Sequence, residues 1–431
     1  MAPHSYVLVL LTSITLAKSL GFALVMNIHS ALQSRRLFLQ PPLRALPQQH
    51  TSFLARLALD QPSPTNHQPR EFAMNGSFRT EVDIPGWPEH TEMGYGDSFF
   101  LLGSCFSDNV GERLARAKLK TAVNPSHGLL FSPLSAAASL DRMVSGTAYS
   151  EDEEGVVFSE GKGLWCSLDH HSTFSSNSRE GCLDAMNAAL ETGRSSLLSA
   201  SCIFITLGTA WVFRHREFGK DVANCHKLPA YLFDRRIVSV DEIAQALHRS
   251  LSNVLRANPR ARIMLTVSPV RHWRDGPVDN GRSKAHLIAG AHAAIELLRS
   301  AGVGEGVGVG GAGHVSYFPS YEIVMDDLRD YRFFEADMIH PNGVAVDYIW
   351  DKLVGAMFSN EAVRTMFEVQ KVVQGAEHRP FNPESDAHQR FLRKQLQKLQ
   401  TLRGKYPGLV LDAEQAFFES QITEPVVTQR R

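Results

Sequence analysis

Residues 98–108 read SFFLLGSCFSD, an apolar run that ends in a Gly-Ser-Cys turn and leads into a stretch of helical period. An α/β fold places reactive groups at such a turn, because the side chain projects from the carboxyl edge of the sheet. Amide groups at a helix start stabilise negative charge, so they are expected to lower the thiol pKa of Cys105 and to hold an oxyanion. Gly103 gives room for a tight bend. A simpler interpretation makes Cys105 a small core residue and Ser107 or Asp108 the helix cap.

Beyond this turn, apolar runs alternate with stretches of helical period. Strands are expected at 98–103, 202–207, 262–267 and 315–318, and helices at about 108–118, 133–143, 240–257 and 282–299. Strands that alternate with helices form a parallel sheet with helices on both faces. The sequence therefore predicts an α/β fold, a three-layer α/β/α sandwich with a mainly parallel, doubly wound sheet.

Three segments depart from this alternation. Residues 145–181 are rich in Ser, Gly and charge, and we expect a long excursion across the carboxyl edge of the sheet, where long loops are often functional. The run at 302–313 spaces Gly306, Gly308 and Gly311 as GxGxxG. Because it follows a helix and precedes a strand, it reverses the dinucleotide-binding order and is expected to be a flexible linker. Residues 359–431 are helical and charged, and we expect them to pack on the outside of the sheet of a domain at 77–358.

The composition narrows the classes of function. With 431 residues, 43% of them hydrophobic, the chain can bury one large core or two modest ones. A net charge of −1 gives no basic footprint, so no nucleic-acid partner is expected. The five cysteines are odd in number and form no CxxC pair, which predicts at least one free thiol. Cys166, His170, His171 and Cys182 match no zinc spacing, so we expect no metal and no cofactor.

The first 76 residues differ from the rest, because no Asp or Glu occurs before Asp60, whereas Lys18 and several arginines do. This pattern is typical of a targeting segment. We expect a removable leader directing the chain to an organelle or the secretory route; a disordered extension and a mis-assigned start codon are the alternatives. Lys18 interrupts the apolar run at 6–26, so no stable membrane span is expected in the mature chain.

A second motif, DMIHPN at 337–342, precedes an apolar helical stretch. A histidine that acts as a base needs a group that fixes its tautomer, and Asp337 lies three residues before His340 in one turn. Pro341 stiffens the entry to the helix. The alternative is that Asp337 is a surface turn residue and that His340 is a capped or buried histidine. The order of nucleophile after the first strand and acid plus base near the last favours a catalytic pair.

Both motifs are part of a longer series of blocks. These are FFLLGSCFSDNVGERL, ITLGTAWVF, VANCHKLPA, LTVSPVRHWRDG, RSKAHL and YFPSYEIVMDDLRDYRFFEADMIHP. In this order the chain resembles the GSCFA family over residues 98–352, and HRPFNPESDAHQRFL at 378–392 resembles that family's carboxyl-terminal extension. The family is similar in pattern to SGNH/GDSL hydrolases, which have a three-layer α/β/α sandwich and a nucleophile in a Gly-Asp-Ser turn after the first strand.

The resemblance implies an esterase or acyl hydrolase acting on a small-molecule or glycan acyl ester. It places Cys105 at the nucleophile with Ser104 as the alternative, His340 at the general base and Asp337 at the orienting acid. Two other functions remain open, namely an acyltransferase that modifies a sugar or alcohol with the same site, and a non-catalytic binding module on the same fold.

The oxyanion site departs from the hydrolase pattern. Where those enzymes have Gly-x-Asn, this chain has Gly208-Thr209-Ala210, and the loss of one donor costs roughly a hundredfold in rate. Backbone N–H groups, at Cys105 and Gly128 above all, are expected to replace it. The further residues expected to bind the oxyanion or the substrate are Gly208, Thr209, His226, Arg271 and His272. A buried polar network that braces loops is the alternative role for His226, Arg271 and His272.

Overall fold

The computed structural model describes residues 81–84, 92–303 and 315–423. The expected leader at 1–76, the expected domain start at Ser77 and the GxGxxG glycines Gly306, Gly308 and Gly311 lie outside the described residues. Within the described ranges, no helix combines the length and the apolar character that a bilayer crossing requires.

The described residues contain a five-stranded parallel sheet in the order β10-β9-β5-β1-β2. Its strands are β1 (Ser98–Gly103), β2 (Lys120–Val123), β5 (Cys202–Leu207), β9 (Arg262–Val267) and β10 (Val315–Phe318). The chain winds outward from β1 to β2 and then returns past β1 to β5, so the strand order reverses between β1 and β5. Ligands of doubly wound folds bind at the carboxyl ends of the strands that flank such a reversal.

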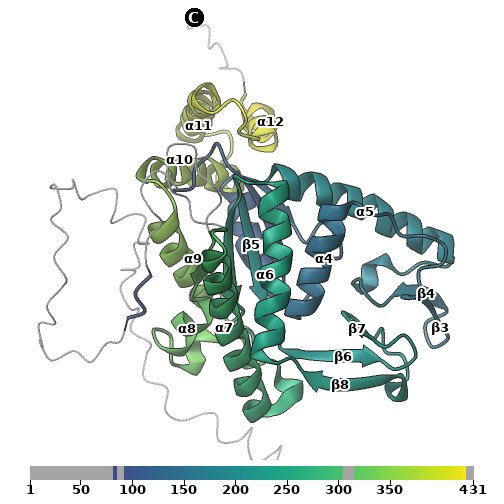
Figure 1. Ribbon diagram of the computed structural model, residues 1–431. Helices are drawn as coiled ribbons and strands as arrows, with labels where there is room; N and C mark the ends of the chain where they lie inside the picture. The colour runs from purple at the N-terminus through teal and green to yellow at the C-terminus, as the bar shows by residue number, and fades with distance from the viewer. Residues whose placement is uncertain (1–80, 85–91, 304–314, 424–431) are drawn as a thin grey trace, which may run out of the picture. The chain divides into compact units, whose positions relative to one another are not determined.

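Helices cover both faces of this sheet, which confirms the predicted three-layer α/β/α fold. One face packs against α3 (Cys105–Arg116), α8 (Ser320–Met325) and α9 (Gly343–Met357). The other packs against α4 (Pro133–Ser145), α5 (Arg179–Ser199), α6 (Val240–Ala257) and α7 (Gly276–Ser300). Figure 1 shows β5 with α9 on one side and α6 and α4 on the other.

Side chains along each strand alternate between the two layers, as the pleat requires. In β1, Phe100 and Leu102 join the core with α4 to α7, whereas Phe99 and Leu101 join the core with α3 and α9. The four residues are at most 2% exposed. Strands buried on both faces read as continuous apolar runs, and this is why the four predicted strands have the observed bounds.

The sequence pattern does not predict α5 or α8, and it also misses strands in two regions. Residues 145–181 are not a plain excursion, because they contain an antiparallel hairpin of β3 (Val156–Ser159) and β4 (Leu164–Ser167). A separate three-stranded antiparallel sheet, in the order β7-β6-β8, follows β5. Its strands are β6 (Trp211–His215), β7 (Lys220–Val222) and β8 (Phe233–Ile237). These strands are short and carry many charged residues, so they lack an apolar run.

The C-terminal helices are α10 (Asn360–Glu377), α11 (Asp386–Lys405) and α12 (Asp412–Gln421), and they share a core of their own. The first turns of α10 join the core that lies between the sheet, α3 and α9, through Ala362, Val363 and Met366. The later helices contact segments at the amino ends of the strands, where Tyr95 lies 5.2 Å from Tyr406 between ring centroids and Lys118 pairs with Glu414 at 2.6 Å. These helices are therefore attached at the edge of the sheet opposite to the Gly-Ser-Cys turn.

Candidate active site

The turn after β1 requires glycine at Gly103. This residue has φ +139°, and a Cβ there would lie 2.2 Å from the carbonyl oxygen of Thr206 on β5. No side chain fits such a gap, because β1 and β5 are held together by their register, which pairs Gly103 with Thr206. The next amide, that of Ser104, donates to the same Thr206 oxygen at 3.2 Å. The turn is thus fixed directly to the neighbouring strand.

Ser104 is the N-cap of α3, so this helix begins three residues earlier than its sequence pattern predicts. The Ser104 side chain accepts from the Phe106 amide at 3.4 Å, and the residue is only 2% exposed. Ser107 and Asp108, the caps of the simpler interpretation, have other partners. The Ser107 hydroxyl donates to Thr206 Oγ1, and the Asp108 carboxylate accepts from the side-chain amide of Asn124. The Ser104 hydroxyl therefore serves the helix start.

Cys105 is the first residue of α3 and is only partly buried. Burial raises the pKa of its thiol, and the charge of Asp108 raises it further. The amides of Cys105 and Phe106 and the charge of Lys284 act in the opposite direction but are outweighed. The expected lowering of this pKa by the helix start is therefore wrong, because desolvation dominates. A neutral thiol must lose its proton to a base before it can act as a nucleophile.

Asp337 and His340 form the pair that their spacing predicts. Oδ2 of Asp337 lies 2.7 Å from Nδ1 of His340, and Oδ1 accepts from the amides of Ile339 and His340 at 2.8 and 3.0 Å. These hydrogen bonds, that from His340 first, lower the pKa of Asp337 to about 2. Met338 turns the chain with φ +59°. With Nδ1 bonded to the carboxylate, Nε2 of His340 is the nitrogen left to exchange a proton.

The segment after β9 contacts this Asp-His turn. The Arg271 amide donates to the Ile339 carbonyl oxygen at 3.2 Å, and the Arg271 guanidinium lies 4.4 Å from the centroid of the Phe334 ring. Burial lowers the pKa of His272 to about 4, and the charges of Lys284, Arg235 and His340 add to the effect. Arg271 and His272 therefore lie beside His340 at the carboxyl edge of the sheet.

Lys284 is a residue that the sequence analysis does not single out. It lies on α7 and is 1% exposed, and its ammonium donates to the carbonyl oxygens of Gly208 and Ser268, both at 2.7 Å. Those carbonyls follow β5 and β9. Lys284 therefore joins the ends of β5 and β9 at the carboxyl edge, and its charge affects the pKa of both Cys105 and His272. A signal exists in the sequence, since Lys284 occupies the buried stripe of α7 with Leu287, Ala291 and Leu298.

Gly208 and Thr209 are engaged elsewhere. Both of their amides donate to the Phe131 carbonyl oxygen, at 2.8 and 2.9 Å, and Thr209 Oγ1 contacts Ser283 Oγ and accepts from the Trp211 amide. In this arrangement neither N–H group can serve an oxyanion. Gly128 has φ +71°, and a Cβ there would lie 2.6 Å from Cβ of His171, so this loop packs tightly against the segment after β4.

His226 is a bracing residue in the structure. It is 3% exposed, and its Nε2 lies 2.6 Å from the carbonyl oxygen of Ser167, the last residue of β4. Burial lowers its pKa. The nearby His170 stacks on His127 with 4.3 Å between ring centroids. Across the described ranges, no three His, Cys, Asp or Glu side chains gather in a way that suits a metal ion.

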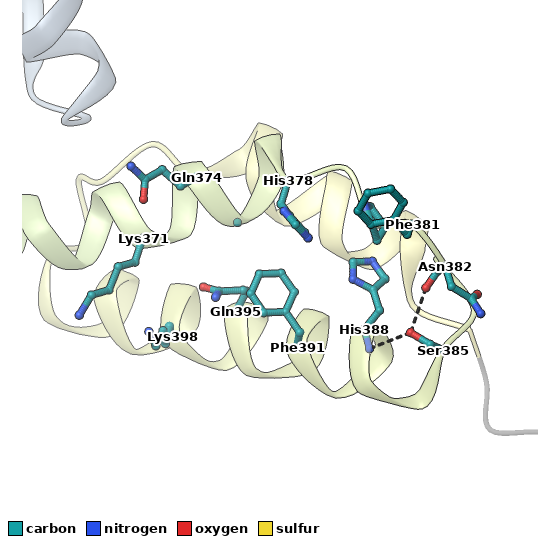
Figure 2. A pocket seen from close by; sticks show the side chains of 12 residues that line it. Lys371, Gln374, His378, Phe381, Asn382, Ser385, His388, Phe391, Gln395 and Lys398 are labelled. Atoms are coloured by element: carbon teal, nitrogen blue, oxygen red, sulfur yellow. Dashed lines mark hydrogen bonds between the residues drawn. The ribbon is translucent and has the colours of Figure 1, made fainter. Parts of the chain in front are cut away.

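A surface groove lies between α10 and α11, away from these residues. It has a volume of about 770 Å³, and Figure 2 shows His378, His388 and Phe391 pointing toward one another inside it. Its remaining lining residues are Lys371, Gln374, Gly375, Pro380, Phe381, Asn382, Ser385, Gln395 and Lys398. None of the residues that the sequence predicts for the site lines this groove, so groove and candidate active site are separate features.

Two protein-family models match this chain. The family model described as the GSCFA family matches residues 98–353, and the one described as the GSCFA domain protein C-terminal domain matches residues 369–424. No curated protein matches the chain.

Proposed function

The chain belongs to the GSCFA family, and on that premise we propose that it is an acyl hydrolase with Cys105 as nucleophile and His340 and Asp337 as base and orienting acid. One observation carries the proposal, namely the 2.7 Å bond between Asp337 and His340 Nδ1. The turn that holds this pair contacts the segment after β9, and Cys105 follows β1 at the same carboxyl edge of the parallel sheet. An oriented imidazole and a thiol at a helix start are the two components that acyl transfer requires.

The proposed reaction has two halves. Nε2 of His340 takes the proton of the Cys105 thiol, the sulfur attacks the ester carbonyl carbon, and the leaving alcohol departs with the proton from the imidazolium. Water then gives a proton to His340 and attacks the thioester, which releases the acid and restores the thiol. The oxyanion formed in each half is held by backbone N–H groups at the start of α3 and at Gly128.

Cys105 is preferred to Ser104 because their surroundings differ. The Ser104 side chain is buried and accepts from the Phe106 amide, whereas Cys105 is partly exposed. The neutral state of the thiol, whose pKa is raised by burial, gives the base a proton to remove. The role of Asp337 is to keep Nδ1 of His340 protonated, so that Nε2 is the basic nitrogen.

An acyltransferase is the second candidate. It is favoured by the packing of the segment after β4 against the Gly128 loop, where the His171 amide donates to the His127 carbonyl oxygen at 2.9 Å. An acyltransferase must protect its thioester from water, and the segment that packs on the Gly128 loop is the part of the fold that could cover the acyl group while an alcohol or sugar hydroxyl attacks it. Added acceptors would then divert the acyl group from water, which product analysis measures.

Hydrolysis of short-chain aryl esters by the full-length protein tests the proposal. We expect Cys105→Ala to abolish turnover and His340→Ala to lower kcat/KM about 10²- to 10⁴-fold. Ser104→Ala is the matched control, because it should cost about 1 kcal/mol of stability through the lost cap and leave turnover largely intact. Loss of activity in Ser104→Ala alone would move the nucleophile to Ser104. Equal activity in all variants would favour a binding module.

A further inference from the structure

The burial of the Lys284 ammonium on α7 costs free energy of desolvation. Lys284 is 1% exposed, and its ammonium donates to two neutral carbonyl oxygens, those of Gly208 and Ser268. Burial of a charge whose partners are neutral carries a large desolvation cost. A leucine or methionine fits the same apolar stripe at lower cost, as Leu287 does one turn further along. The position therefore serves something other than packing.

The placement of Lys284 indicates what it serves. Its two acceptors follow the carboxyl ends of β5 and β9, next to the turn that carries Cys105. The Gly208 acceptor stands two residues after Thr206, the residue that pairs with Gly103 and accepts from the Ser104 amide. The Tyr321 ring on α8 has its centroid 5.8 Å from Nζ, and the Cys105 thiol and the His272 imidazole are near enough to interact with the ammonium charge. Of these, Cys105 is the one that can carry negative charge in the proposed reaction.

We propose that Lys284 is a positioning residue that holds a positive charge beside Cys105 and thereby sets the fraction of this side chain that is thiolate. The thiol lies between opposing charges, since Asp108 disfavours the thiolate and Lys284 favours it. The interaction is reciprocal, because a thiolate at Cys105 also favours the charged ammonium of Lys284. The inference concerns the nucleophile of the proposed function and rests on that function only for the use made of the thiolate.

The charge at Lys284 is itself sensitive to pH. Burial lowers the pKa of Lys284 to about 7, so the ammonium loses its proton in the range in which thiols begin to ionise. Two groups whose charges interact titrate together, and the deprotonation of each makes the deprotonation of the other harder. The Cys105 thiolate is therefore expected to increase less steeply with pH above about 7 than an isolated thiol does.

Alkylation of Cys105 by iodoacetamide in the full-length protein tests this role without any ester. The rate is followed between pH 5.5 and 9.5 by mass spectrometry of the peptide that contains Cys105. Cys225, a partly buried thiol whose pKa burial raises to about 11, is the internal control in the same molecule. For the wild type we expect a profile with two inflections, one of them near pH 7.

Lys284→Met removes the charge and keeps the length of the side chain. It should lower the Cys105 alkylation rate about tenfold at pH 6.5, which corresponds to one pKa unit, and the two proteins should converge at high pH. Asp108→Asn is the matched opposite, because it removes the negative charge and keeps a partner for Asn124. It should raise the rate by at least as large a factor, since the Asp108 charge affects the thiol pKa more than the Lys284 charge does. The Cys225 rate should not change in either variant.

A folded Lys284→Met protein with the wild-type rate at every pH overturns the inference. If this variant does not fold, as its melting curve will show, the wild-type profile decides, and a single inflection overturns the inference. The alkylation result is independent of ester hydrolysis. A protein that hydrolyses no ester but shows the tenfold difference in alkylation rate refutes the proposed function and supports the role of Lys284. A protein that hydrolyses esters but shows no such difference supports the proposed function and refutes the role of Lys284.

Discussion

The tightest contact at the candidate site predicts a large loss of stability for Gly103→Ala. The new Cβ would lie 2.2 Å from the Thr206 carbonyl oxygen and 2.9 Å from two further backbone atoms of Thr206, at φ +139°. Positive φ costs a side-chain-bearing residue about 1–3 kcal/mol. The clash also separates β1 from β5 and strains the buried Ser104 N–H to Thr206 O bond, which adds about 1–3 kcal/mol. We expect a total of about 4 kcal/mol.

Gly219→Ala is the control that isolates the backbone cost. Gly219 has φ +59°, and an added Cβ meets no atom within 4 Å, so we expect a loss of only about 1 kcal/mol. Urea unfolding of both variants, followed by circular dichroism, measures the difference. Equal destabilisation of the two variants would contradict this expectation, because the close approach of the two strands at Gly103 would then contribute nothing to the free energy of unfolding.

Three further changes have defined outcomes. Asp337→Asn replaces the carboxylate that bonds Nδ1 of His340, so kcat/KM for aryl esters should fall about 10²- to 10⁴-fold at neutral pH; an unchanged value would argue against the pair. The buried imidazole of His127 has its pKa lowered to about 3, so the unfolded state binds more protons below pH 6.5 and stability falls as the pH drops from 6.5 toward 3. His127→Gln should make this acid dependence shallower in unfolding measured from pH 7 to 4. Ser239→Ala removes the capping box of α6 with Glu242 and should cost about 1 kcal/mol in urea unfolding.

Strands β1, β5 and β9 of the central sheet could be predicted because they are buried on both faces, whereas β2 is half-exposed and is not predicted. Such strands appear in the sequence as short apolar runs between helical stretches, and β5 and β9 are at most 4% exposed at nearly all positions. The small sheet of β6, β7 and β8 could not be found in this way, because tertiary contacts and not an apolar run hold it. In β8, for example, Asp234 and Arg235 follow each other and Asp234 is exposed.

Helix starts depend on single side chains, which limits what periodicity reveals. The apolar stripe of α3 begins with Phe106, but the helix begins at Cys105 because Ser104 caps it. The start of α7 differs, because this helix begins at Gly276, six residues before the predicted start, without a side-chain cap hydrogen bond and with Pro277 in its first turn. A cap is a local hydrogen bond, so a pattern averaged over several turns does not locate it.

The sequence predicts one part of the candidate site better than the other. The Asp337–His340 bond is local, since three residues in one turn fix it, and its spacing predicts it. The environment of Cys105 depends on Lys284, which is distant in sequence, and on burial, which outweighs the helix amides in setting the thiol pKa. Long-range electrostatics of this kind are not encoded in the spacing of a motif.

The most direct test of the account is to trap the acyl-enzyme. An aryl ester is mixed with the full-length protein, the reaction is quenched in acid within the first turnovers, and the acylated residue is located by peptide fragmentation. If Cys105 is the nucleophile, the acyl group will be found on Cys105, and neutral hydroxylamine will remove it, as expected of a thioester. We also expect His340→Ala to be acylated more slowly. An acyl group on Ser104, or a protein that turns over ester with Cys105 unmodified and replaceable by alanine, would contradict the account.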